Sequence, residues 1–203
     1  PGDEIGVGAI SAENMAFEKF TLSNTENSEV GEFEGTISFA SEYFAIYPYS
    51  GSSRIMMTDC VFNIPQVQKY VENSFSPDCA PMVAKAKYGE TLKFYNLCGL
   101  LALQLKGTER VERITFLGKG ANGKMMDISG TFGFSLSFTD IPTITSGYGA
   151  MGGAYKSTTL VCDEPVQLSE SEATPFYFVL PPATFESFVV IINTADGKVM
   201  MQE

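Results

Sequence analysis

Short stretches in which apolar and polar residues alternate recur along the whole chain, separated by turn-forming residues. Such alternation places every second side chain on one face and is typical of β-strands. Strands are predicted over residues 5–10, 35–39, 43–47, 60–64, 83–87, 91–94, 132–138, 158–162, 176–180, 188–192 and 198–201. Helical periodicity is almost absent, and only residues 66–74 are expected to form a turn or two of helix.

The segment 92–118 carries the clearest pattern in the chain. An apolar run over 97–105 ends at Lys106-Gly107, and a second, alternating run begins at Val111. We expect two adjacent strands here, the first nearly buried on both faces. Hairpin turns are predicted at 88–90 and 193–197, and surface loops at 15–31 and at the glycine-rich 146–156.

Few helices and a strand every ten to fifteen residues or so predict an all-β fold, an antiparallel sandwich or barrel. Because strands suited to a core lie on both sides of each polar segment, we expect one domain over residues 1–203. Hydrophobic residues make up 44% and aromatics 12%, which is enough for a substantial core. No apolar run approaches the roughly 20 residues that span a bilayer, so a soluble chain is expected.

The formal net charge of -11 argues against some partners. Nucleic acid and anionic lipid would both meet a repulsive field, because no cluster of Lys or Arg is present to displace counterions. We therefore expect neither nucleic acid nor direct membrane binding among its partners.

Catalytic and cofactor chemistry finds little support. The chain contains no His, so Ser-His-Asp and Cys-His arrangements cannot form. A glycosidase pair is the remaining option, and its candidate carboxylates are Glu32, Glu34, Asp127, Asp140 and Glu186. Surface carboxylates are expected in an acidic protein, so no catalytic residue is predicted and the chain is expected not to be an enzyme. The segment 146–156 lacks the GK[ST] ending of a phosphate loop, and no cofactor is expected.

Metal ligation is not expected either. Acidic pairs occur at Asp163-Glu164 and at Glu170 and Glu172, but their spacing matches no calcium-loop motif. The four cysteines Cys60, Cys79, Cys98 and Cys162 contain no CxxC pair that would chelate zinc. Their even number permits two disulfides, although the spacing suggests no framework, and the sequence leaves their redox state open.

Several separated segments resemble, in the same order, the fimbrillin-like proteins of Bacteroidetes, the type V pilins. The resemblance rests on residues 2–7 (GDEIGV), 43–49 (YFAIYPY), 62–68 (FNIPQVQ), 81–86 (PMVAKA), 96–101 (NLCGLL), 104–107 (QLKG), 113–118 (RITFLG), 176–182 (FYFVLPP) and 196–198 (DGK). It implies the N-terminal domain of a fimbrillin, with a transthyretin-like Greek-key sandwich of two antiparallel sheets. It also implies a lipoprotein precursor that is exported to the outer membrane and built into adhesive surface fibres, or fimbriae.

In the pilin members of this family, a protease removes the first strand and a strand from a neighbouring subunit fills the groove. The resemblance thus implies a non-catalytic adhesion subunit whose partners are other fimbrial subunits, joined by strand addition. A host or bacterial surface receptor or glycan is a further expected partner, and the membrane is reached only through a lipid anchor outside this chain. The sequence begins at the Gly-Asp motif and ends soon after the last hairpin, so the family's first strand and second domain are expected to lie outside it.

A different class of function stays open beside this one. Exposed tyrosines stack well against sugar rings, so the chain is alternatively a glycan-binding module of the cell surface. The tyrosines in question are Tyr43, Tyr47, Tyr49, Tyr148 and Tyr155. The glycan hypothesis predicts that they gather on one exposed face, whereas the fibre hypothesis predicts an open sheet edge.

Overall fold

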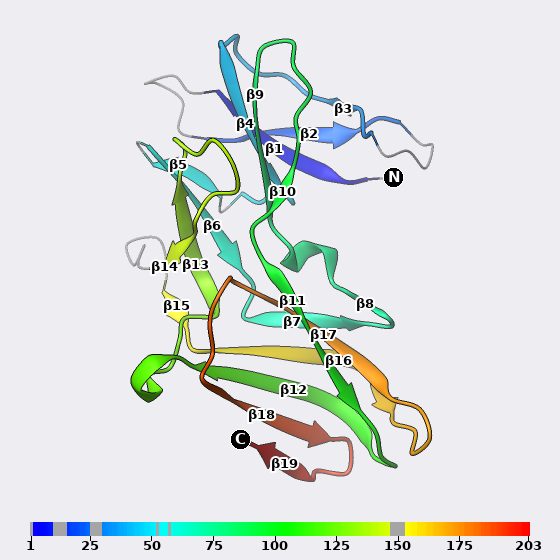
Figure 1. Cartoon of the computed structure of the whole chain (residues 1–203). Coiled ribbons are helices and arrows are strands. Elements are labelled where there is room, and N and C mark those ends of the chain that lie inside the picture. The colour runs from blue at the N-terminus through cyan, green and yellow to red at the C-terminus, as the bar shows by residue number, and fades with distance from the viewer. Residues whose placement is uncertain (1, 10–15, 25–29, 52, 57, 147–152) are drawn as a thin grey trace. The chain divides into compact units, whose positions relative to one another are not determined.

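The computed structural model describes residues 2–9, 16–24, 30–51, 53–56, 58–146 and 153–203 (Figure 1). The predicted all-β fold is confirmed: the described residues form antiparallel sheets, with one parallel pairing between β7 (Val67–Val71) and β16 (Ser157–Gln167). Helix is limited, in that part of the chain, to short 3-10 turns at Pro77–Cys79 and Ala121–Gly123.

The chain divides into two compact units, each assembled from three segments. Unit 1 consists of Pro1–Asn63, Ala80–Leu97 and Phe132–Thr145, and unit 2 of Ile64–Cys79, Cys98–Thr131 and Ser146–Glu203. The chain thus passes repeatedly from one unit to the other. The single domain expected from the sequence stays a prediction.

Unit 1 contains a six-stranded sheet in the order β10-β9-β4-β1-β2-β3. Its strands are β1 (Glu4–Ala9), β2 (Glu18–Leu22), β3 (Phe33–Glu34), β4 (Glu42–Tyr47), β9 (Met82–Lys87) and β10 (Tyr95–Asn96). A second sheet has the order β14-β13-β6-β5 and lies only partly in unit 1. Its strands are β5 (Arg54–Met56), β6 (Asp59–Ile64), β13 (Ser129–Ser135), of which residues from Phe132 onward belong to unit 1, and β14 (Thr145–Ser146). Phe44 of the first sheet meets Phe138, whose ring lies 5.7 Å from that of Phe134 on β13. These edge-on ring contacts hold the two sheets of unit 1 together.

Unit 2 also contains a six-stranded sheet, in the order β19-β18-β12-β16-β7-β8. The strands not yet given are β8 (Ser74–Phe75), β12 (Arg110–Lys119), β18 (Ser187–Thr194) and β19 (Val199–Gln202). A two-stranded sheet of β11 (Gly99–Leu105) and β17 (Thr174–Leu180) covers one face of it. The short β15 (Ala154–Tyr155) pairs with β13 at Ser129 and Gly130.

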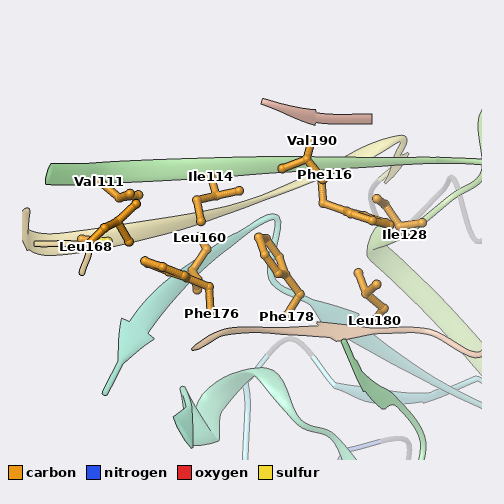
Figure 2. Packing of buried hydrophobic residues seen from close by; sticks show 11 residues of the cluster. Val111, Ile114, Phe116, Ile128, Leu160, Leu168, Phe176, Phe178, Leu180 and Val190 are labelled. Carbon is orange, nitrogen blue, oxygen red and sulfur yellow. The ribbon is translucent and has the colours of Figure 1, made fainter. Parts of the chain in front are cut away.

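Buried side chains from both layers fill the space between these two sheets. Figure 2 shows Ile114 and Phe116 of β12 and Leu160 of β16 facing Phe176 and Phe178 of β17. Each of these five side chains is at most 2% exposed. The arrangement is the two-layer packing of a β-sandwich, with apolar inner faces in contact.

Several predicted elements are wrong. Residues 35–39 and 91–94 form no strand. The turn predicted at 88–90 is present, with the Glu90 amide donating to the Lys87 carbonyl at 3.0 Å, but the strand that returns beside β9 is β10, which begins at Tyr95. The helical turn predicted over 66–74 is instead the strand pair β7–β8, and the expected loop 15–31 contains β2. Residues 147–152 of the glycine-rich loop lie outside the described part of the chain. The hairpin at 193–197 is confirmed, with the Thr194 amide donating to the Lys198 carbonyl at 3.0 Å and Gly197 at φ 83°.

Candidate functional site

Strand β11 is paired along one edge only, among the described residues. It runs antiparallel to β17 from Gly99 opposite Leu180 to Leu105 opposite Thr174. β12 instead lies between β16 and β18 in the other sheet, so the predicted pairing of the two strands of segment 92–118 is wrong. The other edge of β11 carries peptide groups with no strand beside them in the part of the chain that the structure describes.

The side chains of β11 alternate between a half-buried and an exposed face. Leu101, Leu103 and Leu105 are half-buried and pack against the core of unit 2, whereas Leu100 is 52% exposed. The prediction of a strand nearly buried on both faces is therefore wrong. The reason is that the six-stranded sheet covers only one face of the β11–β17 pair.

The opposite edge of this pair, along β17, is occupied by a side chain. Gln68 of β7 is 2% exposed, and its Nε2 donates to the Val179 carbonyl at 2.8 Å. The Val179 amide donates in turn to Gln68 Oε1 at 2.9 Å. One glutamine thus satisfies both peptide groups that a neighbouring strand would otherwise bind.

This contact fixes which groups of β11 face its open edge. Because the Val179 peptide groups point toward Gln68, its partner Leu100 forms a non-hydrogen-bonded pair with it. The same holds at every second position, so the peptide groups of Leu100, Ala102 and Gln104 point away from β17. Pro175, opposite Gln104, agrees with this register, since proline has no N–H to donate.

An uncovered strip of the larger sheet lies on the side toward which β11 presents its open edge. β17 contacts β7 and β8 at one end of that sheet, so β11, on the other edge of β17, lies toward β18 and β19. At that end the inner face carries Phe188, 46% exposed, although its ring stacks on Phe116 at 5.7 Å. Ile192 is half-buried, and Met200 opposite it is 42% exposed. Here apolar inner-face side chains have no strand above them among the described residues.

These features together form what we call the acceptor edge: the outward peptide groups of β11, its inward leucines, and the strip of Phe188, Ile192 and Met200. Sequence analysis did not find Gln68 or the strip. Because a polar residue occupies the buried position of β7, the alternation of apolar and polar residues typical of a strand is missing there. The apolar residues of the strip lie near the end of the sequence, where the sequence alone does not distinguish them from single exposed apolar residues.

The candidate tyrosines that the structure describes are divided between the two units. Tyr43 and Tyr47 pack against the buried cluster of Ile5, Val7 and Ala45 in unit 1, and the Tyr47 hydroxyl donates to Asp3 Oδ1 at 3.3 Å. Tyr49 is half-buried, and Tyr155, in unit 2, is 47% exposed. Tyr148 lies outside the described residues.

The candidate carboxylates are also divided between the two units. Glu32, Glu34 and Asp140 are exposed in unit 1 and Glu186 is exposed in unit 2. Asp127 forms an ion pair with Lys156 at 2.6 Å and accepts a hydrogen bond from Ser146 Oγ at 2.8 Å.

The acidic residues considered for calcium do not form a cluster. Asp163 and Glu164 lie on the strand β16 rather than in a loop, and Asp163 is paired with Lys69 at 3.4 Å. Across the described residues, no group of three or more His, Cys, Asp or Glu side chains is arranged to hold a metal ion.

All four cysteines are free thiols. Cys60, Cys79 and Cys162 are buried, and Cys98 is half-buried just before β11. Burial raises the pKa of Cys98 to about 12 and that of Cys162 to about 11, and it raises the pKa values of Cys60 and Cys79 as well. These thiols are held in the unreactive protonated form at neutral pH.

Comparisons of the chain with protein-family models, with curated proteins and with solved structures found no match in any of the three. No helix within the described ranges has both the length and the apolar character needed to cross a bilayer.

Proposed function

We propose that this chain is a non-catalytic structural and adhesion subunit of a bacterial surface fibre, joined to a neighbouring subunit through a strand accepted along β11. The observation that carries the proposal is the acceptor edge of unit 2. There, outward peptide groups at Leu100, Ala102 and Gln104 adjoin a strip of uncovered apolar side chains. An incoming strand would hydrogen-bond to these peptide groups and cover these apolar side chains at the same time.

The energetics of strand addition favour a long-lived contact between neighbouring subunits. A donated strand would hydrogen-bond to the open edge of β11 and turn every second side chain toward Phe188, Ile192 and Met200. Each large apolar side chain that becomes fully buried contributes roughly 1.5–3 kcal/mol. Burial of these side chains, burial of the inward side chains of the donated strand, and its hydrogen bonds to β11 together act against the roughly 1–2 kcal/mol per residue that ordering the strand costs.

The resemblance to the fimbrillin-like family supports the cellular setting of the proposal. Under it, the chain is exported to the outer membrane and the cell surface. It is anchored there by lipid and joined to other fimbrial subunits. The acceptor edge and the resemblance are independent lines of support, because the first rests on register and burial and the second on sequence motifs.

The test uses two synthetic peptides as long as β11, 7 residues, with identical Ile and Thr composition. One alternates Ile and Thr, and in the other the Ile residues are contiguous. At about 100 times its Kd, a bound peptide stabilises the native state by roughly 2.7 kcal/mol. For a chain of this size we therefore expect the alternating peptide to raise the Tm by about 5–10 °C.

Two variants at one position make the test specific. Ala102→Pro removes an N–H that points to the open edge and leaves the hydrogen bonds to β17 in place, so it should abolish the rise in Tm. Ala102→Thr keeps that N–H and should respond like the parent protein. Equal responses to both peptides, or an Ala102→Pro variant that responds like the parent, would refute strand acceptance along β11.

A further inference from the structure

Unit 1 contains an apolar cavity on the face of its six-stranded sheet that points away from β5 and β6. Ile5 and Val7 of β1 project to this face, whereas Gly6 and Gly8, on the other face, meet Phe17 and Ile55. No sheet covers the first face in the described structure. It is partly covered by irregular segments, which contribute Ile37, Leu92 and Phe94, and by Phe33 of the edge strand β3.

The covering leaves a space of about 850 Å³. Ile5, Val7 and Ala86 line it from the sheet, while Phe20, Tyr43 and Leu92 are among the larger side chains around it. The lining residue Ala86 of β9 has a small side chain and leaves room at this point of the sheet face. The volume lies within the range of about 300–1,000 Å³ of small-molecule sites.

The cavity suits a hydrocarbon chain better than a peptide. It lies on the face of paired strands, whose peptide groups bind one another across β1, β4 and β9. A peptide would bring its own N–H and C=O groups into an apolar space that offers few partners, at a cost of about 1–3 kcal/mol for each group. An alkyl chain carries no such groups.

The charges among its lining residues favour an anionic head group. Lys87 and Lys93 both line the cavity, and neither has an ion pair among the described residues. Glu90 lines the cavity as well, and its Oε2 accepts a hydrogen bond from the Lys87 backbone amide at 3.1 Å, so the two lysines and one glutamate give the lining a net formal charge of +1. Two free ammonium groups beside an apolar space are notable in a chain whose net charge is -11.

We propose that this cavity binds a long-chain aliphatic carboxylate. The alkyl chain lies against Ile5, Val7 and Leu92, and the carboxylate forms ion pairs with Lys87 and Lys93. This proposal concerns unit 1 alone and does not depend on strand acceptance in unit 2.

The test is isothermal titration of the full chain with hexadecanoate and with hexadecanol, which has the same chain length and no charge. Hexadecanoate should bind saturably at one site per chain. Lys87→Glu should weaken hexadecanoate binding by roughly tenfold, the loss expected for one charge-assisted ion pair, and leave hexadecanol within about twofold. Lys124→Glu in unit 2 makes the same change in net charge and should leave both affinities unaltered.

A second variant tests the apolar part of the site. Ala86→Leu places extra methyl groups in the cavity and should weaken both ligands, with near-UV circular dichroism confirming the native fold. Three results would overturn the proposal: no saturable hexadecanoate binding, equal binding by the folded Ala86→Leu variant, or equal losses for acid and alcohol in Lys87→Glu. If Ala86→Leu does not fold, the comparison of hexadecanoate and hexadecanol binding to the surface variant Lys87→Glu still tests the proposal.

Discussion

Gln68 takes the place of a neighbouring strand along one peptide unit of Val179. Its amide donates to the Val179 carbonyl and accepts from the Val179 amide, at 2.8 and 2.9 Å, and all of these groups are buried. The contact joins the two layers of unit 2, because Gln68 lies on β7 of the larger sheet and Val179 on β17 of the smaller one. It also sets the direction of the free peptide groups on β11.

Replacing Gln68 should therefore destabilise unit 2. Gln68→Ala leaves the buried N–H and C=O of Val179 without partners and creates a cavity, which costs about 2–4 kcal/mol in the free energy of unfolding. Urea unfolding measures this loss, and amide exchange at Val179 should quicken in parallel. Gln104→Ala, at an exposed position of β11, is the matched control and should change stability by less than about 0.5 kcal/mol. Equal losses of unfolding free energy at the two positions would show that the contact between Gln68 and Val179 does not stabilise unit 2.

A glycine contact gives a second prediction for unit 2. A Cβ atom at Gly118 of β12 would collide with the ring of Phe185, which packs edge-on against Phe116 at 5.6 Å. Gly118→Ala should therefore lower the free energy of unfolding by about 1–3 kcal/mol, as overpacking does. Gly99→Ala meets nothing within 4 Å and should be nearly neutral. A Gly118→Ala variant as stable as Gly99→Ala would contradict the packing described here.

The strands that the sequence predicted correctly are those whose inner residues are apolar. Residues 43–47 and 176–180 fall within β4 and β17 because Phe44, Ile46, Phe176 and Phe178 are buried. Residues 66–74 were misjudged because Gln68 is the buried residue of β7, while Val67 is 60% exposed. An alternation rule cannot anticipate a polar side chain that substitutes for a strand.

The other errors have a common cause in tertiary packing. Ile37 and Phe94 belong to segments that look like strands, but they cross the face of the unit 1 sheet as irregular chain. Apolar residues are needed to cover a sheet whether or not they lie in strands. The acceptor edge depends likewise on which strands pair. The paired residues of β11 and β17 are 69 (Leu105 and Thr174) to 81 (Gly99 and Leu180) positions apart, so their pairing leaves no local signal in the sequence.

The cysteines should be almost inert in the folded protein. Burial holds the thiol pKa values of Cys98 and Cys162 at about 12 and about 11, so little thiolate forms at pH 8. We expect a thiol-specific chromogenic disulfide reagent to react slowly with the native chain and to titrate all four thiols once guanidinium is added. Rapid labelling of the native protein, or fewer than four thiols after unfolding under non-reducing conditions, would show that this description is wrong.

The last hairpin should respond to acid. Hydrogen bonds from Thr194 and Lys198 lower the pKa of Asp196 from 3.8 to about 2. A carboxyl whose pKa is lower in the folded state stabilises it above its unfolded pKa, and that contribution is lost as the pH falls through the folded value. The Tm of the parent protein should therefore exceed that of Asp196→Asn at pH 6, and the two should converge toward pH 2. A difference in Tm that is constant with pH would exclude this role for the carboxylate.

Amide hydrogen exchange along β11, measured by NMR with and without the alternating Ile-Thr peptide, tests the central claim most directly. In the free protein, the amides of Leu101 and Leu103 should exchange slowly because they bind β17, whereas those of Leu100, Ala102 and Gln104 should exchange fast. Adding the peptide should slow these last three amides by an order of magnitude or more and leave the first two nearly unchanged. Slow exchange at all five positions in the free protein, or no change on adding the peptide, would contradict strand acceptance by this edge.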